Sequence, residues 1–532
     1  MTHTAPSEEA ANTTPEERRT ADATVRRSRA HPAAPYTTPA RSRWIRLRPY
    51  ALPALTTLGL GLMRLTSGGY KVDTALYAGV AQRMIETGQW WTPSAGAVPY
   101  FNKPPLVMWI HGLFMSIAGA DLWAIRLPQL FAAIGCILAG THIARRLAGR
   151  SAALVAGMIV ALSWPVAKHL NRLVLDYWTV LFILIGVACV VEAWSRSVRG
   201  PRPVTQTAGW MLAAGVSIGL ATLCKPFFAF IALPILAIWL ILERQAKLAA
   251  WLTLAVVAAL AVNLPWHLSM ASIHGEVFTS QYLGREIVSR GVGQGGFGRN
   301  PFWWYFYFMA REWWPWLPVL VVALWAFVRG AHTHNTRPVR PALTFTAVWV
   351  GVWIVLLSAF ADKRDRYMMH LWPALALPCA LYITRFAPAR IRQGDSRAWT
   401  VLAALCMVGG LVGLTLGMVT HADRPDDDWA ALIDRMHEIR AAEPGTAVYE
   451  SFRHPPRGAK VYLTADIWPE PMFYGSPAAF REPPTGAVVL ADFKDLTPID
   501  LDEHAESRFG KWRLLRYEPW MRTNFERWLG QP

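Results

Sequence analysis

Long apolar runs separated by short polar loops set the pattern of this chain from about residue 49 to residue 420. Such runs can cross a hydrocarbon core of about 30 Å, where backbone groups must hydrogen-bond within their own segment. The pattern therefore predicts a polytopic α-helical membrane protein with about 11 to 13 transmembrane helices. The most apolar runs are 49–66, 122–144, 151–166, 175–194, 207–223, 227–243, 249–268, 313–329, 342–360, 368–385 and 398–420.

The two ends of the chain have a different composition. Residues 1–43 are rich in Thr, Ala, Pro and Arg without apolar periodicity, which predicts a disordered, basic cytoplasmic tail before a transmembrane domain over 44–420. Residues 421–532 are more polar and predict a small α/β domain. We expect a helix near Asp427–Ala442 and strands such as Thr446–Tyr449, Ala459–Leu463 and Gly486–Ala491.

One apolar segment, Pro104–Gly119, is short for a membrane span, and we predict a re-entrant or interfacial helix on the outer side. With this choice, five basic loops between later spans fall on the cytoplasmic side, as the positive-inside rule requires. The arginines before the first span place the N-terminus in the cytoplasm. An odd number of spans then places the C-terminal domain outside the cytoplasm. The first span is followed by a long loop on the outer side.

Composition and charge fit this interpretation. The chain has 532 residues, of which 53% are hydrophobic and 17% charged, and a formal net charge of +17. Its basic residues are spread over short loops between apolar runs, so membrane topology explains the charge and we expect no nucleic-acid partner. The five cysteines lie in or at the ends of apolar segments without metal-ligand spacing, as expected for small core hydrophobes.

The stretch from Tyr70 to Trp109 carries an acid, Asp73, and a lysine, Lys103, among aromatic residues next to a predicted span. Ionisable groups at a membrane are costly and usually have a function. Other cations also fall on the predicted outer side, and together they suit an anionic lipid head group. These are Lys168, Arg172, Arg285, Arg290, Arg299, Lys363, Arg364 and Arg366. The alternative is that short outer loops tolerate several basic residues.

Six motifs in order carry a resemblance to a known family. They are Asp73-x-x-x-Tyr77 with Gly88-x-Trp90, Phe101-Asn-Lys103-Pro-Pro-Leu106, Trp123-x-x-Arg126-Leu-Pro128, Arg172-Leu-Val-Leu-Asp176, Tyr282…Glu286…Arg290, and Lys363-Arg-Asp-Arg366-Tyr367. The chain resembles the integral-membrane C-type glycosyltransferases, in particular the branch of the lipid A aminoarabinose transferase and the bacterial protein O-mannosyltransferase-like enzymes. It departs from the family's usual residues at Thr74, where a second acid is frequent, and at Asn102 and Ile287.

The resemblance implies an inverting hexosyl- or pentosyltransferase in the bacterial cytoplasmic membrane. Such an enzyme moves a sugar from a polyprenyl-phosphate donor to an envelope lipid, glycan or protein. It implies that cations stabilise the leaving lipid phosphate and that a carboxylate serves as general base. The implied catalytic residues are Asp73 first, then Asp176 and Glu286. The implied substrate-binding residues are Tyr77, Lys103, Arg172, Arg290, Lys363, Arg366 and Tyr367.

Other roles for these residues stay open. Asp73 and Asp176 could each cap a helix, and Glu286 could form a structural pair with Arg290 at helical spacing. No cofactor is expected to be required, although a weakly held divalent cation between Asp73 and Asp176 is an option. The alternative function is a transporter or flippase of a lipid-linked anionic glycan, which would place ionisable residues in mid-span. A structural membrane scaffold would need no converging acid–lysine set.

Overall fold

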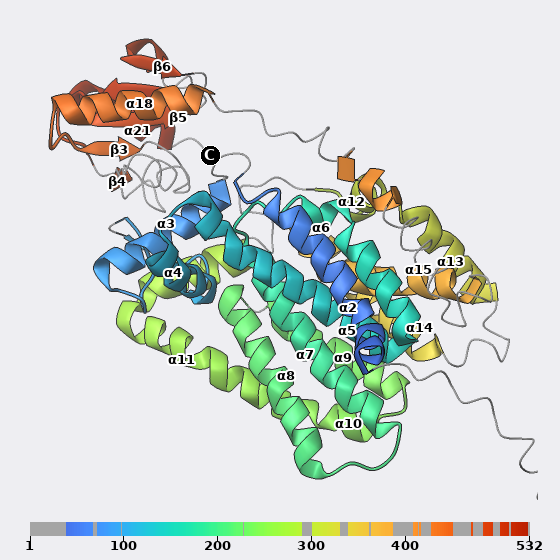
Figure 1. Cartoon of the computed structure of the whole chain (residues 1–532). Coiled ribbons are helices and arrows are strands. Elements are labelled where there is room, and N and C mark those ends of the chain that lie inside the picture. Colours follow the sequence, from blue (N-terminus) through green and yellow to red (C-terminus); the bar gives the residue numbers. More distant parts are fainter. Residues whose placement is uncertain are drawn as a thin grey trace, which may run out of the picture. The chain divides into compact units, whose positions relative to one another are not determined.

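The computed structural model of the chain describes residues 39–66, 72–96, 98–226, 228–289, 300–329, 339–360, 363–386, 408–412, 414–415, 427–450, 470–471, 482–492, 501–509 and 512–529. Helices make up most of the part before residue 387 (Figure 1). Within the described residues, five helical segments are long and apolar enough to cross a membrane. They are α5 (Leu122–Ala161), α7 (Leu175–Ser197), α8 (Val204–Cys224), the segment Ala246–Gly284 and α14 (Arg340–Ala359).

The remaining helices of this part are shorter or differently composed. The segment Ala246–Gly284 contains α10 (Ala246–Ala250) and α11 (Leu252–Thr279) and enters the π-helix η2 (Ser280–Ser289). The others are α2 (Pro39–Leu62), α6 (Trp164–Ala167), η1 (Phe228–Ile231), α9 (Ala232–Leu242), α12 (Trp304–Glu312), α13 (Leu317–Arg329), η4 (Asp365–Met368) and α15 (Trp372–Phe386).

The helix bounds refine the predicted spans. The run 122–144 and most of the run 151–166 lie in α5, on either side of Gly149, whose φ of 87° and ψ of 178° interrupt the helix, while the end of the second run lies in α6. Glycine tolerates this positive φ because it has no Cβ. The first span was predicted to begin at residue 49, but α2 begins at Pro39, so the predicted tail over 1–43 ends too late. Alanine and arginine in this segment are good helix formers, which extends the helix beyond its apolar part. Most of the run 398–420 lies outside the described residues.

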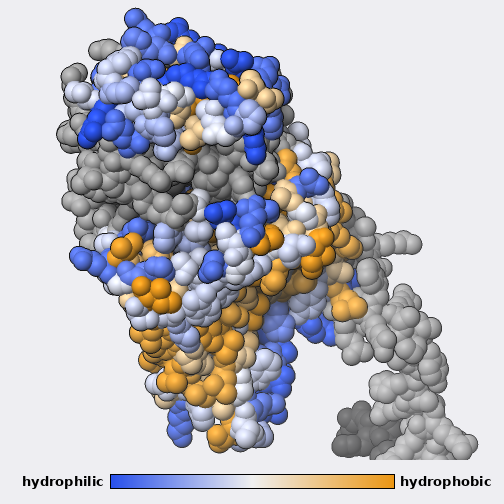
Figure 2. Space-filling view, turned by 90° about the vertical axis from the view of Figure 1, so that its left-hand side faces the viewer, coloured by the Kyte–Doolittle hydropathy of each residue, from blue (hydrophilic) through white to orange (hydrophobic). Residues whose placement is uncertain are grey.

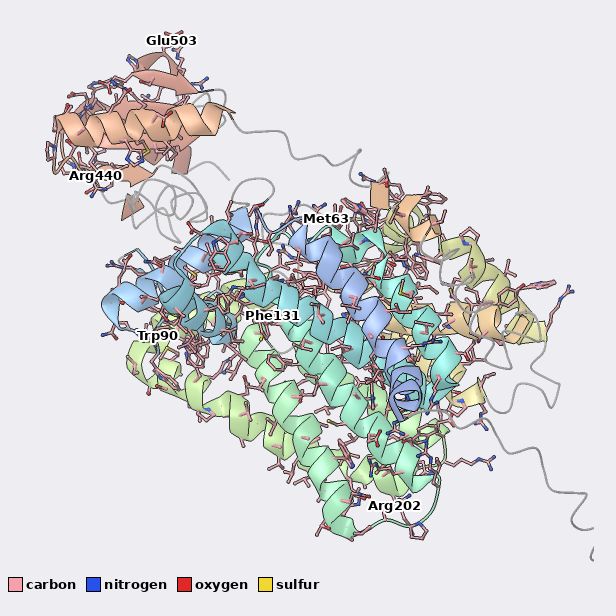
Figure 3. All side chains as sticks on the ribbon, in the orientation of Figure 1. Met63, Trp90, Phe131, Arg202, Arg440 and Glu503 are labelled. Atoms are coloured by element: carbon pink, nitrogen blue, oxygen red, sulfur yellow. The ribbon has the colours of Figure 1, made fainter. Side chains whose placement is uncertain are left out.

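The first loop of the membrane domain is built from short elements. α3 (Val72–Thr87) leads into an antiparallel pair, β1 (Ser94–Ala95) and β2 (Val98–Pro99), and then into α4 (Leu106–Ala118). With 13 residues, α4 is about 20 Å long, which is short of a bilayer core. In Figure 3, Trp90 of this loop and Arg202, which precedes α8, lie toward opposite ends of the helices. The predicted re-entrant or interfacial character of Pro104–Gly119 agrees with this length.

Apolar side chains both fill the core and cover part of the surface. The main core joins α5, α7, α8, α9, α14 and α15 and contains several fully buried tryptophans, such as Trp239, Trp349 and Trp372. A broad hydrophobic surface covers much of the helical part visible in Figure 2, with hydrophilic side chains at its lower end. On α11, exposed Val257 and Leu268 are examples of outward apolar residues. Such a surface is suited to lipid rather than to water.

The described part of the C-terminal region is an α/β unit. Its sheet has the order β4-β3-β5-β7-β6, in which β3 is parallel to β4 and β5, while β7 is antiparallel to β5 and β6. The strands are β3 (Val448–Glu450), β4 (Glu470–Pro471), β5 (Val488–Asp492), β6 (Ser507–Phe509) and β7 (Trp512–Arg516). α18 (Asp427–Ala442) packs on one face and α21 (Arg522–Leu529) on the other. The predicted helix and two predicted strands are present, whereas Ala459–Leu463 lies outside the described residues.

Candidate functional site

Arg366 joins the two aspartates that the sequence nominated. Its guanidinium pairs with the carboxylate of Asp73, and its Nε lies 3.3 Å from Oδ2 of Asp176. Asp73 is in the first turn of α3 and Asp176 in the first turn of α7. The amino ends of helices carry partial positive charge, which favours a carboxylate at each position. Three elements far apart in the sequence therefore meet in one site.

Lys225 is a fourth member that the sequence analysis missed. Its Nζ lies 2.8 Å from Oδ1 of Asp176 and 3.9 Å from the ring centroid of Tyr367. α8 ends at Cys224, and Pro226 holds the preceding Lys225 in extended backbone with φ −149° and ψ 130°. That conformation turns the chain out of the helix at the lysine. The feature of the sequence that could have identified Lys225 is its Lys-Pro pair between two apolar runs.

The two carboxylates differ in access. The side chain of Asp176 is 8% exposed and has a cation on each oxygen, while that of Asp73 is 33% exposed and, within the described residues, its ion pair is with Arg366. A reacting molecule could thus reach Asp73 more readily than Asp176. Asp176 is the anchor between Lys225 and Arg366.

A second group of charges adjoins Arg366 through Asp365. Nζ of Lys168 lies 2.5 Å from Oδ2 of Asp365 and 3.1 Å from Oε2 of Glu312, and Nε2 of His169 lies 3.4 Å from the same Asp365 oxygen. Burial opposes the charge on Asp365, but His169 and Lys168 hold its pKa well below the usual range. Burial lowers the pKa of His169, so the imidazole is neutral at pH 7.

Three other residues that the sequence predicted for substrate binding lie on the elements that surround the carboxylate pair. Tyr77 is buried one turn after Asp73 in α3. Lys103 is buried in the loop before α4. Arg172 lies in the loop before α7, and its Nε has no hydrogen-bond partner among the described residues. The start of α4, α3, the loop before α7 and the end of α8 share one small core, which brings these loops together.

Three nominated residues are not part of the carboxylate cluster as described. Nζ of Lys363 donates to the backbone oxygens of Phe360 (2.6 Å) and Asn300 (3.0 Å), and burial lowers the pKa of this lysine. Lys363 thus satisfies carbonyls at the end of α14 and not the nominated acids. The backbone of Glu286 lies in η2, but its side chain is outside the described residues, as is all of Arg290.

The alternative roles suggested for the aspartates can be tested against the geometry. The N-cap of α7 is Val174, so Asp176 is not the capping residue. Asp73 lies inside the first turn of α3, which begins at Val72. The Arg366 guanidinium lies between the two acids in the described structure, and the option of a weakly held divalent cation there stays a prediction. We therefore assign no step to a metal.

Thr74, which departs from the family's usual second acid, has a structural contact. It is fully buried, and its Oγ1 accepts a hydrogen bond of 3.0 Å from the backbone N–H of Leu173. Leu173 lies in the loop before α7, between Arg172 and Asp176. The bond therefore fastens the start of α3 to the loop that leads to the second aspartate.

Comparison with known proteins agrees with the motifs. Residues 102–268 match the family described as dolichyl-phosphate-mannose-protein mannosyltransferase. The chain is 27% identical to undecaprenyl phosphate-alpha-4-amino-4-deoxy-L-arabinose arabinosyl transferase of Pseudomonas paraeruginosa over 336 residues, 61% of this chain and 57% of that protein. For the same transferase of Enterobacter sp., identity is 25% over 359 residues, with 66% and 62% covered. The chain thus spans less than two thirds of the length of these relatives.

Solved structures match over more of the chain. ArnT from Cupriavidus metallidurans bound to undecaprenyl phosphate superposes with a TM-score of 0.68 at 18% identity, covering 87% of this chain and 97% of ArnT. The archaeal oligosaccharyltransferase AglB from Archaeoglobus fulgidus gives 0.58 at 13% identity, covering 91% and 75%. The chain therefore has an ArnT-like fold. The resemblance to integral-membrane C-type glycosyltransferases that the sequence indicated is confirmed.

Proposed function

We propose that this chain is an inverting glycosyltransferase that moves a sugar from a polyprenyl-phosphate donor to an envelope acceptor at the outer face of the bacterial cytoplasmic membrane. The observation that carries the proposal is the pair Asp73–Asp176, joined by Arg366 at the ends of two helices in an ArnT-like fold. The names of the relatives supply the donor class, undecaprenyl phosphate carrying an amino-arabinose. The acceptor can be a lipid, a glycan or a protein.

The proposed reaction is a single displacement at the anomeric carbon. The bond from this carbon to the phosphate oxygen of the donor breaks, and a bond to the acceptor oxygen forms on the opposite face, which inverts the centre. Polyprenyl phosphate leaves with the electron pair. If the acceptor is a hydroxyl, its proton passes to Asp73, the more exposed of the two carboxylates. Asp176 and Arg366 orient Asp73 and do not take the proton.

The leaving phosphate needs a cation that is not already committed to a carboxylate. Lys225 and Arg366 are both engaged with aspartates, and Lys363 is engaged with backbone oxygens. We therefore assign the phosphate to Arg172, which comes from the loop before α7. Lys103, from the loop before α4, is proposed beside it because of the family motif in which it stands and not because of its contacts. The buried Arg172 Nε, which has no acceptor among the described residues, supports this assignment, because an arginine fork suits phosphate oxygens.

The proposed orientation follows from charge. The basic loops at 145–150, 196–202, 243–247, 329–340 and 385–397 would face the cytoplasm with the N-terminus. The active site and the C-terminal domain would then face outward, where lipid-linked sugars meet envelope acceptors. The short length of α4 supports this arrangement, because an additional span at that point would reverse every later loop.

A transporter is the weaker alternative. It would be expected to carry its ionisable groups in mid-span. The described carboxylates and cations instead lie at helix ends and in the connecting segments, namely the first turns of α3 and α7, the end of α8, and η4. A fixed set of charges at these ends is better suited to aligning reactants.

The test uses purified protein in liposomes with two donors, undecaprenyl phosphate carrying amino-arabinose and the mannosyl equivalent, and an envelope extract as acceptor. Asp73→Asn keeps the size of the side chain and removes its charge, so we expect turnover to fall about 10²–10⁴-fold with unchanged melting. Asp121→Asn, an exposed acid before α5, is the matched control. Normal turnover of Asp73→Asn would refute the assignment of Asp73, and no transfer by the unaltered protein would refute the function.

A further inference from the structure

Lys168 contacts two separate elements, η4 and α12, with one ammonium group. It follows α6, and its Nζ lies 2.5 Å from Asp365 of η4 and 3.1 Å from Glu312 at the end of α12. The same Nζ stands 4.8 Å from the ring centroid of Phe308, also on α12. The Lys168 side chain is 13% exposed, so water screens these charges little. None of these atoms belongs to the carboxylate pair described above.

Asp365 links Lys168 to Arg366. One of its oxygens, Oδ2, takes the Lys168 ammonium, while the other, Oδ1, accepts a hydrogen bond of 2.8 Å from the backbone N–H of Arg366. The carboxylate therefore fixes the backbone of η4 at the residue whose side chain joins Asp73 and Asp176. Its ion pair with Lys168 connects η4 to the segment that precedes α7, the helix that carries Asp176.

The bridge made by Arg366 depends on the position of η4. Its guanidinium must reach carboxylates on two different helices, and the contact from Nε to Asp176 is already 3.3 Å. A shift of η4 by about 1 Å would break that contact, and misplacements of this size away from the reacting atoms can cost about a hundredfold in rate. An element with only a short 3-10 turn needs outside contacts to hold such a position.

We propose that Lys168 is a positioning residue, which through Asp365 holds Arg366 where its guanidinium joins Asp73 and Asp176. The kinetic consequences of this inference rest on the proposed glycosyl transfer. The claim that Lys168 and Asp365 hold Arg366 in position does not depend on that function. Lys168 touches no reacting atom, so its loss should lower kcat and leave the KM for the donor nearly unchanged.

His169 gives this hypothesis a distinctive signature. Its Nε2 faces the same Asp365 oxygen, at 3.4 Å. Burial first, and then the charges of Lys168 and Arg172, lower the pKa of His169, while Asp365 raises it. Glu312, the other acid near Lys168, lies on α12 beside Arg311, whose Nε is 3.9 Å from Oε1 of Glu312. Without Lys168, the pKa of His169 should rise, and on acidification His169 can take over the pairing with Asp365.

The experiment compares Lys168→Met with the double variant Lys168→Met/His169→Gln in the liposome assay. We expect Lys168→Met to lower kcat about 10- to 100-fold at pH 8. Its activity relative to the unaltered protein should recover about fivefold or more between pH 8 and pH 6, because protonated His169 replaces the lost cation. The double variant should show no recovery. Equal pH dependence of the two variants, or a kcat equal to that of the unaltered protein, would overturn the proposal.

Melting of the purified protein in detergent tests the same contacts without any donor. Lys168→Met should lower the melting temperature less at pH 6 than at pH 8, and this difference should vanish in the double variant. Lys168→Met and Arg366→Gln should be non-additive, because Asp365 connects them. Additive effects would overturn the inference even if the chain has no transferase activity. If Lys168→Met does not fold, Lys168→Arg and Asp365→Asn are used instead as the two single variants of a double-mutant cycle. Lys247→Met, at an exposed lysine on α10, is the control.

Discussion

Replacing Lys225 by methionine is the sharpest test of the carboxylate cluster, because this residue connects α8 to Asp176. Methionine keeps much of the length and the apolar stem but removes the ammonium. Asp176 would then keep only the 3.3 Å contact to Arg366, and Tyr367 would lose the cation 3.9 Å from its ring centroid. The side chain of Asp176 is almost completely buried, so water cannot replace the lost partner.

The size of the effect follows from these contacts. Removing one partner of a buried ion pair costs about 3–5 kcal/mol, and the remaining Arg366 contact places Lys225→Met near 3 kcal/mol. Asp176→Asn should cost a similar amount, because it removes the counter-charge of Lys225 and one of the two carboxylates that pair with Arg366. The double variant leaves no uncompensated charge between these two positions. We therefore expect it to be more stable than the sum of the single effects predicts, by about 2 kcal/mol.

The assay is thermal unfolding in detergent together with turnover in liposomes. Lys225→Arg should melt nearly like the unaltered protein, and Lys247→Met should change stability by less than about 0.5 kcal/mol. The Lys225→Met/Asp176→Asn variant should recover stability without recovering turnover, since Arg366 would still lack one of its two carboxylates. Additive losses of stability would show that Lys225 and Asp176 do not interact, and would refute this description of the site.

Three further outcomes follow from the described contacts. Cysteines placed at Gly119 and Gly149 should be labelled from opposite sides of the membrane, and labelling from one side would refute the topology. Thr74→Val should destabilise by about 1–3 kcal/mol in melting experiments, because a buried N–H loses its acceptor. Asp365→Asn should destabilise at pH 7, and the difference should shrink below about pH 4, because a carboxyl with a depressed pKa contributes stability only while ionised. A pH-independent difference would refute this role.

The sequence predicted the individual helices and strands better than it predicted the contacts between them. Apolar run length located the five helical segments that are long and apolar enough to span, and α18 has the bounds expected for Asp427–Ala442 because its periodicity is regular. Asp73 and Asp176 could be proposed as site residues because each stands in a motif that resembles the glycosyltransferase family. Their connection could not be predicted, because it depends on how α3, α7 and η4 pack.

The choice among the late cations shows where local sequence is insufficient. Lys363, Arg364 and Arg366 lie within four residues, and composition alone does not say which one meets the carboxylates. The end of α14 needs donors for its free carbonyl groups, and Lys363 supplies one. The 3-10 turn then places Arg366 toward the acids. Side-chain direction in this segment is set by the turn, which no periodicity reveals.

The charge balance of the cluster decides how the remaining cations should be understood. Four carboxylates, those of Asp73, Asp176, Glu312 and Asp365, meet four permanent cations among the described residues, Lys168, Lys225, Arg311 and Arg366. While His169 is neutral, the described cluster therefore carries no net charge, and by itself it offers a lipid phosphate no net attraction. Attraction of a donor phosphate toward Asp73 has to come from cations outside the cluster. The positive charge on the loops before α4 and α7 is thus required by the proposed chemistry, because the cluster that aligns the acceptor has none to spare.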